Sequence, residues 1–95
     1  MEKLTDKEVA IRLAELDEWV MQDQRIEKEY EFADFQTAMS FMNLLVPTAD
    51  ALNHHPDWSN SYNRVHISLT SHDAGGLTDA DFQFAAAADE VMAQL

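Results

Sequence analysis

The chain has 95 residues with a hydrophobic fraction of 46% and no cysteine. The length favours a single domain over residues 1–95, and the missing cysteines exclude disulfides, thiolate nucleophiles and cysteine metal ligands. A formal net charge of -12 argues against direct binding to nucleic acid and against attraction to an anionic membrane surface. No stretch is long and apolar enough to cross a bilayer, and the first residues lack an apolar signal segment, so we expect a cytoplasmic protein.

The first third of the chain predicts one helix and two strands. Residues 5–8 fit a Thr-x-x-Glu capping box, and the apolar residues that follow recur at helical spacing, which predicts a helix over 6–16. A short strand is expected over 19–21. Residues 25–32 alternate between apolar and charged side chains, which is typical of a strand with one buried and one solvated face. Lys28 interrupts the apolar side once.

A second helix is expected after Asp34, whose carboxylate can accept a hydrogen bond from the backbone of the first turn. An apolar stripe runs from Phe35 to Val46 at helical spacing. Pro47 lacks a backbone N–H, so we expect it to kink the helix or to end its first part, with a further turn or two over 48–53.

The second half of the chain predicts two strands and a third helix. Strands are expected over 57–62 and 65–69, joined by a hairpin turn at 63–64. A glycine pair at 75–76 precedes a helix that begins near Thr78. The predicted order is α-β-β-α-β-β-α. Strands joined largely by hairpins favour an antiparallel sheet, so we expect an α+β fold with a four-stranded antiparallel sheet covered by helices on one face.

The histidines are the strongest candidates for chemistry, because imidazole gains and loses protons near neutral pH. His54 and His55 precede Pro56, which favours extended backbone at His55, so the two rings are expected at a corner and pointing in different directions. His72 follows the strand that contains His66 and could converge with the pair on one pocket. The alternatives are surface or capping histidines without chemistry, and a zinc site, which the lack of cysteine and of a His-Glu-x-x-His motif disfavours.

Polar and aromatic residues near the histidines provide supporting candidates. Asp50 lies four residues before His54, so the two side chains would be neighbours on a continuing helix. Asp81 fits the third position of a capped helix, and a carboxylate there can also orient an imidazole. Trp58 and Tyr62 can stack on a flat heterocycle, although burial in the core is the more common role for such residues.

The spacing of these residues resembles the signature of the pterin-4a-carbinolamine dehydratase family. In that signature an acidic residue, a His-His-Pro triplet, an aromatic residue, a histidine and an aspartate follow one another at fixed intervals. The matching positions here are Asp50, His54, His55, Pro56, Tyr62, His72 and Asp81. More loosely, the resemblance includes the N-terminal helix, Trp19 and residues 32–35.

The resemblance implies the α-β-β-α-β-β-α fold and an enzyme that needs no cofactor and no metal. Its substrate would be the 4a-hydroxytetrahydropterin that aromatic amino acid hydroxylases release, and its product quinonoid dihydropterin. The residues that match the family's catalytic histidines are His54, His55 and His72. The residues in its substrate-contacting segments are Asn53, His54, His55, Thr70, Ser71, His72 and Asp73. Asp50, Asp81 and Trp58 are supporting candidates, and we expect His54 and His72 to transfer protons while His55 orients the pterin.

The sequence departs from the family pattern at three positions and leaves other functions open. Asp50 stands where glutamate is common, Pro47 interrupts a helix that is usually continuous, and Glu18 stands where glycine is common. None of these removes a candidate proton-transfer residue. The alternatives are a non-enzymatic binding or assembly module on the same fold, and a metal-binding protein. The resemblance also implies a homodimer or homotetramer, built by joining sheet edges and packing helices.

Overall fold

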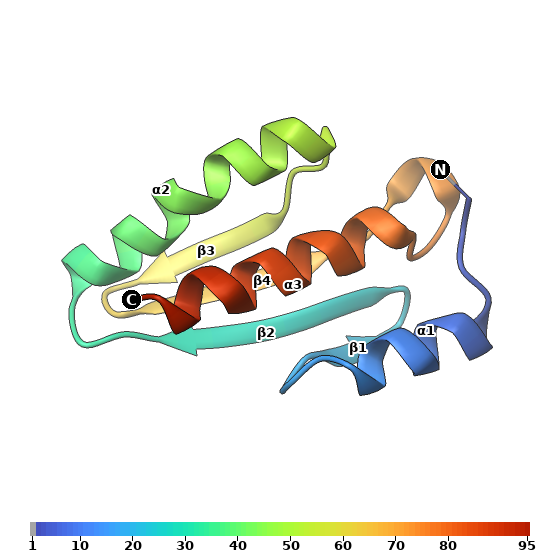
Figure 1. Cartoon of the computed structure of the whole chain (residues 1–95), viewed down its shortest axis with the longest axis horizontal. Coiled ribbons are helices and arrows are strands. Elements are labelled where there is room, and N and C mark those ends of the chain that lie inside the picture. Colours follow the sequence, from blue (N-terminus) through green and yellow to red (C-terminus); the bar gives the residue numbers. More distant parts are fainter. Residues whose placement is uncertain (1) are drawn as a thin grey trace.

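The structure, a computed structural model, describes residues 2–95 and has its elements in the predicted order (Figure 1). The helices and strands are α1 (Asp6–Ala14), β1 (Val20–Gln22), β2 (Arg25–Glu31), α2 (Phe35–Leu52), β3 (Asp57–Ser61), β4 (Arg64–Leu69) and α3 (Asp79–Ala93). A short 3₁₀ helix that the sequence did not predict, η1 (His72–Ala74), lies between β4 and α3. The order α-β-β-α-β-β-α is therefore confirmed.

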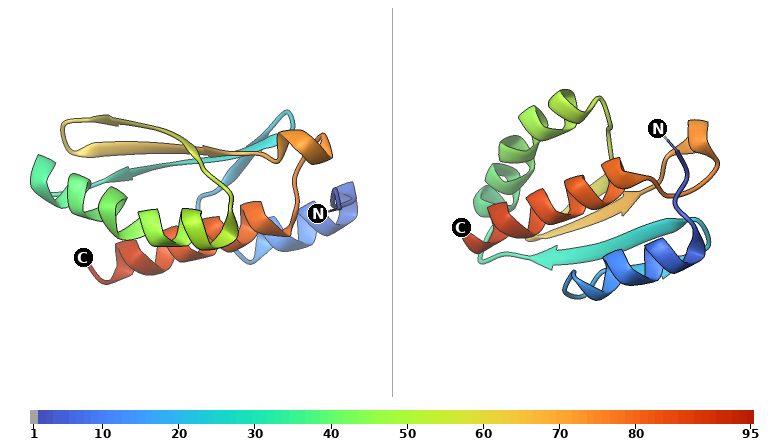
Figure 2. Two further views of the ribbon diagram at one scale, coloured as in Figure 1. Left: turned by 90° about the horizontal axis from the view of Figure 1, so that it is seen from above. Right: turned by 45° about the vertical axis from the view of Figure 1, so that its right-hand side comes forward.

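The strands form one antiparallel sheet in the order β1-β2-β4-β3, so β1 and β3 are its edges. Hairpins join β1 to β2 and β3 to β4, while the central pairing of β2 with β4 places Tyr30 opposite Val65. The three helices lie on one side of this sheet, as the left-hand view of Figure 2 shows. The predicted α+β class with helices on one face is confirmed.

Helix α1 begins with the predicted capping box. The Thr5 hydroxyl accepts a hydrogen bond from the backbone N–H of Glu8 at 3.1 Å, and the Glu8 carboxylate accepts one from the backbone N–H of Thr5 at 2.9 Å. The hydrogen bonds from Thr5, chiefly that from its backbone, lower the pKa of Glu8. The helix ends at Ala14, earlier than predicted, because its last turn tightens and the N–H of Leu16 bonds to the carbonyl of Leu13.

Helix α2 is capped by Asp34, as predicted, but it continues through Pro47, so the proline does not end it. The missing N–H of Pro47 leaves the carbonyl of Asn43 without its helical partner. Both residues are exposed, so water can bond this carbonyl. On the opposite side of the helix Phe41 and Leu45 are fully buried, and their packing holds the helix across the proline.

The β3–β4 hairpin turns at Tyr62 and Asn63, and the prediction of Asn63 and Arg64 was wrong. Ser61 pairs with Arg64 in the sheet, so Arg64 already belongs to the next strand. Tyr62 adopts a positive φ of 50°. The side-chain amide of Asn60 donates to the carbonyls of Tyr62 and Arg64, both at 3.0 Å. These hydrogen bonds fix the position of the turn, which the alternation of residues along the strands did not reveal.

Lys28, the charged residue on the apolar side of β2, has partners in two other segments. Its ammonium group lies 2.8 Å from Asp89 of α3 and donates to the carbonyl of Asp17 at 2.8 Å. Asp89 also accepts a hydrogen bond from the hydroxyl of Tyr30. The interruption in the apolar pattern is therefore a polar link between β2 and α3.

The core fills the space between the sheet and helices α2 and α3. Its largest fully buried apolar side chains are Phe41, Phe84, Ile26, Leu45, Ile67, Leu69, Leu77 and Val65. Helices α2 and α3 run in opposite directions, and β4 runs with α2. The C-terminal ends of α2 and β4 and the N-terminal end of α3 therefore lie at one end of the molecule (Figure 1). This arrangement positions the candidate site.

Candidate active site

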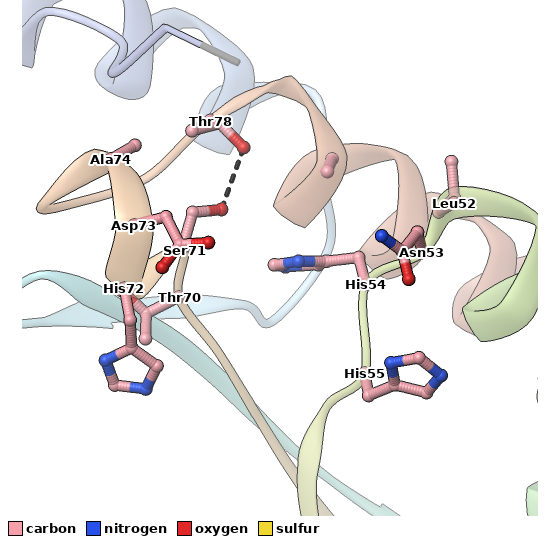
Figure 3. Close-up of a pocket in the computed structure, with 11 residues that line it drawn as sticks. Leu52, Asn53, His54, His55, Thr70, Ser71, His72, Asp73, Ala74 and Thr78 are labelled. Atoms are coloured by element: carbon pink, nitrogen blue, oxygen red, sulfur yellow. Dashed lines mark hydrogen bonds between the residues drawn. The ribbon is translucent and has the colours of Figure 1, made fainter.

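A cavity of about 520 Å³ lies where these three element ends meet. Three segments contribute its lining, namely the end of α2, the η1 region and the start of α3 (Figure 3). The lining residues are Leu52, Asn53, His54, His55, Thr70, Ser71, His72, Asp73, Ala74, Thr78 and Ala80. The histidine pair and His72, which are distant in sequence, therefore share one cavity.

The end of α2 separates the two adjacent histidines. Asn53 adopts the left-handed conformation with φ 48° and donates its N–H to the carbonyls of Ala49 and Asp50. The N–H of His54 also bonds to the carbonyl of Ala49, at 3.0 Å, which completes a Schellman-type cap. Asparagine tolerates this backbone conformation better than most residues. The chain leaves the helix here, and the rings of His54 and His55 point in different directions, as predicted (Figure 3).

His54 is held by a buried carboxylate. Its Nε2 lies 2.5 Å from Oδ1 of Asp81, which has no exposed side-chain surface. Oδ2 of Asp81 accepts hydrogen bonds from the Ser71 hydroxyl and from the backbone N–H of Thr78, both at 2.9 Å. Asp81 therefore occupies the helix-start position that the sequence predicts and also orients an imidazole.

His55, not His54, contacts Asp50. The predicted neighbourhood of Asp50 and His54 requires a helix that continues to residue 54, but α2 ends at Leu52. His55 Nε2 lies 3.1 Å from Asp50 Oδ1, with 61% and 70% of the two side chains exposed. A side-chain contact this exposed contributes little to stability.

The η1 region supplies the opposite wall of the cavity. His72 and Asp73 are exposed there, and Gly75 closes the short helix with a φ of 76° that favours glycine. The Thr70 hydroxyl donates to the carbonyl of Gln24 at 2.6 Å. The hydroxyl proton of Thr70 is used in this hydrogen bond, while the hydroxyl oxygen can still accept one.

Three residues named from the sequence neither line the cavity nor have a side-chain hydrogen bond to a residue that does. Trp58 packs edge-on against Phe84, with ring centroids 6.4 Å apart, which fits the core alternative. Tyr62 sits in the β3–β4 turn with 66% of its surface exposed. His66 lies within β4, where its Nε2 is 3.0 Å from Glu27.

Thr78 lines the cavity but was not predicted as a site residue, although the helix that it begins was predicted. Thr78 is 1% exposed, and its hydroxyl lies 2.8 Å from that of Ser71. Only the folded chain brings these two hydroxyls together. Leu52, Ala74 and Ala80 complete the lining and carry no polar signal that a sequence pattern could reveal.

Residues 2–95 contain neither a candidate metal site nor a candidate membrane span. In that part of the chain no group of three or more histidine, aspartate or glutamate side chains is arranged to hold a metal ion. Within the same residues, none of the helices combines the length and apolarity needed to cross a bilayer.

Comparison with known proteins gives one consistent family. The family model for pterin 4 alpha carbinolamine dehydratase matches residues 2–91. A Solibacter usitatus protein provisionally named pterin-4-alpha-carbinolamine dehydratase is 46% identical over 91 residues, covering 96% of each chain. A Sulfurisphaera tokodaii protein with the same name is 45% identical over 92 residues, covering 97% of this chain and 99% of its own.

Solved structures agree with the sequence relatives. The crystal structure of a transcriptional coactivator/pterin dehydratase from Brucella melitensis has a TM-score of 0.91 and 36% identity, covering 95% of this chain and 98% of its own. A pterin dehydratase-like RuBisCO assembly factor of the alpha-carboxysome has a TM-score of 0.67 at 22% identity, a likeness that concerns the fold alone. From the match over residues 2–91 and these near-full-length relatives, we conclude that the chain belongs to the pterin 4 alpha carbinolamine dehydratase family.

Proposed function

We propose that this protein is a hydro-lyase that converts 4a-hydroxytetrahydrobiopterin into quinonoid dihydropterin and water by histidine general acid–base catalysis. It would thereby recycle tetrahydrobiopterin for aromatic amino acid hydroxylases. The observation that carries the proposal is the cavity that His54, His55 and His72 share in a member of this family.

The reaction needs one proton delivered and one removed. Hydroxide is a poor leaving group, so an acid must protonate the 4a hydroxyl as its C–O bond breaks. A proton must also leave the pterin ring as the new double bond forms. General acid–base assistance is typically worth about 10²–10⁴-fold, and imidazole suits both steps near neutral pH.

His54 and His72 are the proposed proton-transfer residues, because they come from opposite walls of the cavity. Asp81 occupies Nε2 of His54, so Nδ1 is the ring nitrogen left for exchange with the substrate. His72 is exposed, and this favours exchange with solvent between turnovers.

The remaining polar residues would bind the pterin. His55, with Asp50 beside it, would orient the ring. Asn53 and Asp73 would bond its amide and amine edge. Since the Thr70 hydroxyl already donates to the backbone, its oxygen would accept from a ring amine. The resemblance adds Ser71 to these contacts, while Trp58 supports the core behind them.

The test is a dehydration assay on freshly prepared 4a-hydroxytetrahydropterin. We expect His54→Ala and His72→Ala each to lower kcat by about 10²-fold or more, because each removes a proton-transfer group. His55→Ala should raise KM more than it lowers kcat. The matched control is His66→Ala, since His66 pairs with Glu27 away from the cavity, and it should keep wild-type kinetics. Unchanged turnover in all three cavity variants would discard the mechanism.

A binding or assembly role is the second candidate, because the Brucella melitensis relative is described as a transcriptional coactivator as well as a pterin dehydratase. Such a role would not need the histidines. Partners captured equally well by wild type and by a His54→Ala, His72→Ala double variant that lacks turnover would favour it.

We also propose that the protein is a homodimer or homotetramer. Two free sheet edges, β1 and β3, can pair with another copy. The outer side of α2 is uncharged over residues 43–47 and exposes Leu44 and Val46 at 55% and 44%. In a chain of net charge -12, such a surface suits contact between copies. Light scattering on the purified protein measures the state directly.

A further inference from the structure

Two hydroxyl groups connect the start of α3 to the imidazole of His54. The Thr78 hydroxyl lies 2.8 Å from that of Ser71 (Figure 3). The Ser71 hydroxyl donates to Asp81 at 2.9 Å. Asp81 in turn lies 2.5 Å from Nε2 of His54. Thr78 is 1% exposed and Asp81 is 0% exposed, while Ser71, which lines the cavity, is partly exposed.

The direction of each hydrogen bond follows from the number of protons. An ionised carboxylate only accepts, so both the Ser71 hydroxyl and the His54 Nε2–H donate to Asp81. The single proton of Ser71 is then used, and Thr78 must donate to Ser71. The third donor to Asp81 is the backbone N–H of Thr78, which no side-chain substitution removes.

We propose that Ser71 and Thr78 are positioning residues that act through Asp81 on His54. This rests on the proposed function of His54 as a proton-transfer residue. It departs from the expectation that Ser71 contacts the substrate, because the hydroxyl of Ser71 is occupied within the protein. Together the two hydroxyls hold Asp81 in place and moderate its pull on the Nε2 proton.

Removing the Ser71 hydroxyl therefore has an electrostatic consequence with a definite sign. With one donor fewer, the Asp81 carboxylate attracts the imidazolium proton more strongly, so His54 keeps that proton to higher pH. Asp81 is the only charged partner of His54 among the ion pairs of residues 2–95. The other titratable groups lining the cavity are His55, His72 and Asp73, and the variants below leave them unchanged.

The experiment measures the titration of His54 and the pH profile of kcat in the same variants. The ¹⁵N signals of the imidazole ring report both tautomer and protonation without any need for turnover. The variants are Ser71→Ala and Thr78→Val, with Ser71→Thr and Thr78→Ser to restore each hydroxyl. Ser59→Ala, an exposed serine of β3 outside the cavity lining, is the matched control.

In wild type we expect the proton of neutral His54 on Nε2. In Ser71→Ala the titration midpoint and the corresponding limb of the kcat profile should move to higher pH by about half a unit, and kcat should fall by about tenfold. Thr78→Val should move the titration midpoint and the limb of the kcat profile in the same direction by a smaller amount, because it only weakens the hydrogen bond that Ser71 donates to Asp81. The hydroxyl-restoring variants and Ser59→Ala should titrate like wild type.

Two results would overturn the proposal. The first is a lower thermal stability with an unmoved midpoint, which would make the hydroxyls merely structural. The second is a raised KM with an unmoved midpoint, which would make Ser71 a substrate contact. A shifted midpoint in a protein without dehydratase activity would support the positioning role and reject the proposed function, so the two failures are distinguishable.

Discussion

The carboxylate of Asp89, between β2 and α3, accepts hydrogen bonds from several side chains. Lys28 lies 2.8 Å from it, the Trp19 indole N–H donates to both its oxygens at 3.2 Å, and Tyr30 donates its hydroxyl proton. The lysine side chain is 11% exposed and sits over the Tyr30 ring. Burial, followed by the adjacent Asp89, raises the pKa of Tyr30, so the phenol remains a donor. The charge on Asp89 balances that of Lys28.

Asp89→Asn should therefore destabilise the fold by about 2–3 kcal/mol, because it leaves the Lys28 ammonium without its counter-charge in a poorly solvated place. Urea unfolding measures the change. Glu90→Gln, an exposed neighbour on the same helix, should stay within about 0.5 kcal/mol of wild type. Adding Lys28→Met to Asp89→Asn should recover part of the loss, and full additivity of the two changes would contradict a paired charge.

At the scale of elements, Pro47 removes one backbone hydrogen bond from α2, and the helix continues through it. Pro47→Ala restores the N–H that can bond to the Asn43 carbonyl, and should stabilise the protein by about 1–2 kcal/mol, less than the full helix-interior cost of proline because both groups are solvated. The midpoint of urea unfolding provides the measurement. Gln36→Ala in the first turn of α2 is the control and should change stability by less than about 0.5 kcal/mol. A less stable Pro47→Ala variant would mean that the proline is required for the shape of the helix.

The elements also show which features the sequence could predict. Alternation in β2 and the apolar stripe of α2 are local patterns, and both elements form where expected. The β3–β4 turn was misplaced because the Asn60 side chain decides it. The cavity histidines were singled out by their chemistry and the other polar lining residues by the family resemblance. The pairing of His54 with Asp81 instead of Asp50 depends on where α2 ends and on how α3 packs. Thr78 was not predicted because its contact with Ser71 also depends on how α3 packs.

At the scale of the whole molecule, the charge of -12 predicts a protein stabilised by salt. Like charges repel in the compact state, and raising the ionic strength from 0.01 to 1 M shortens the screening length from about 30 to about 3 Å. We expect Tm to rise by about 5 °C in 1 M NaCl, equivalent to about 1 kcal/mol in a domain of this size.

A variant with fewer acidic groups provides the control for this prediction. Glu2, Glu15 and Glu90 are exposed and take no part in the ion pairs of residues 2–95. Replacing all three with glutamine should reduce the salt response. An equal or larger response in this variant, or a Tm that falls with salt in wild type, would contradict self-repulsion as the cause.

Because α2 ends and α3 begins at the same cavity, the peptide dipoles of the two helices give it an electrical polarity before any ligand arrives. The C-terminus of α2, beside His54, carries partial negative charge, and the N-terminus of α3, beside Asp81, carries partial positive charge. Positive charge is therefore favoured beside the end of α2, and negative charge beside the start of α3. The imidazole and the carboxylate stand on those respective sides, so the helix dipoles favour positive charge at the first and negative charge at the second.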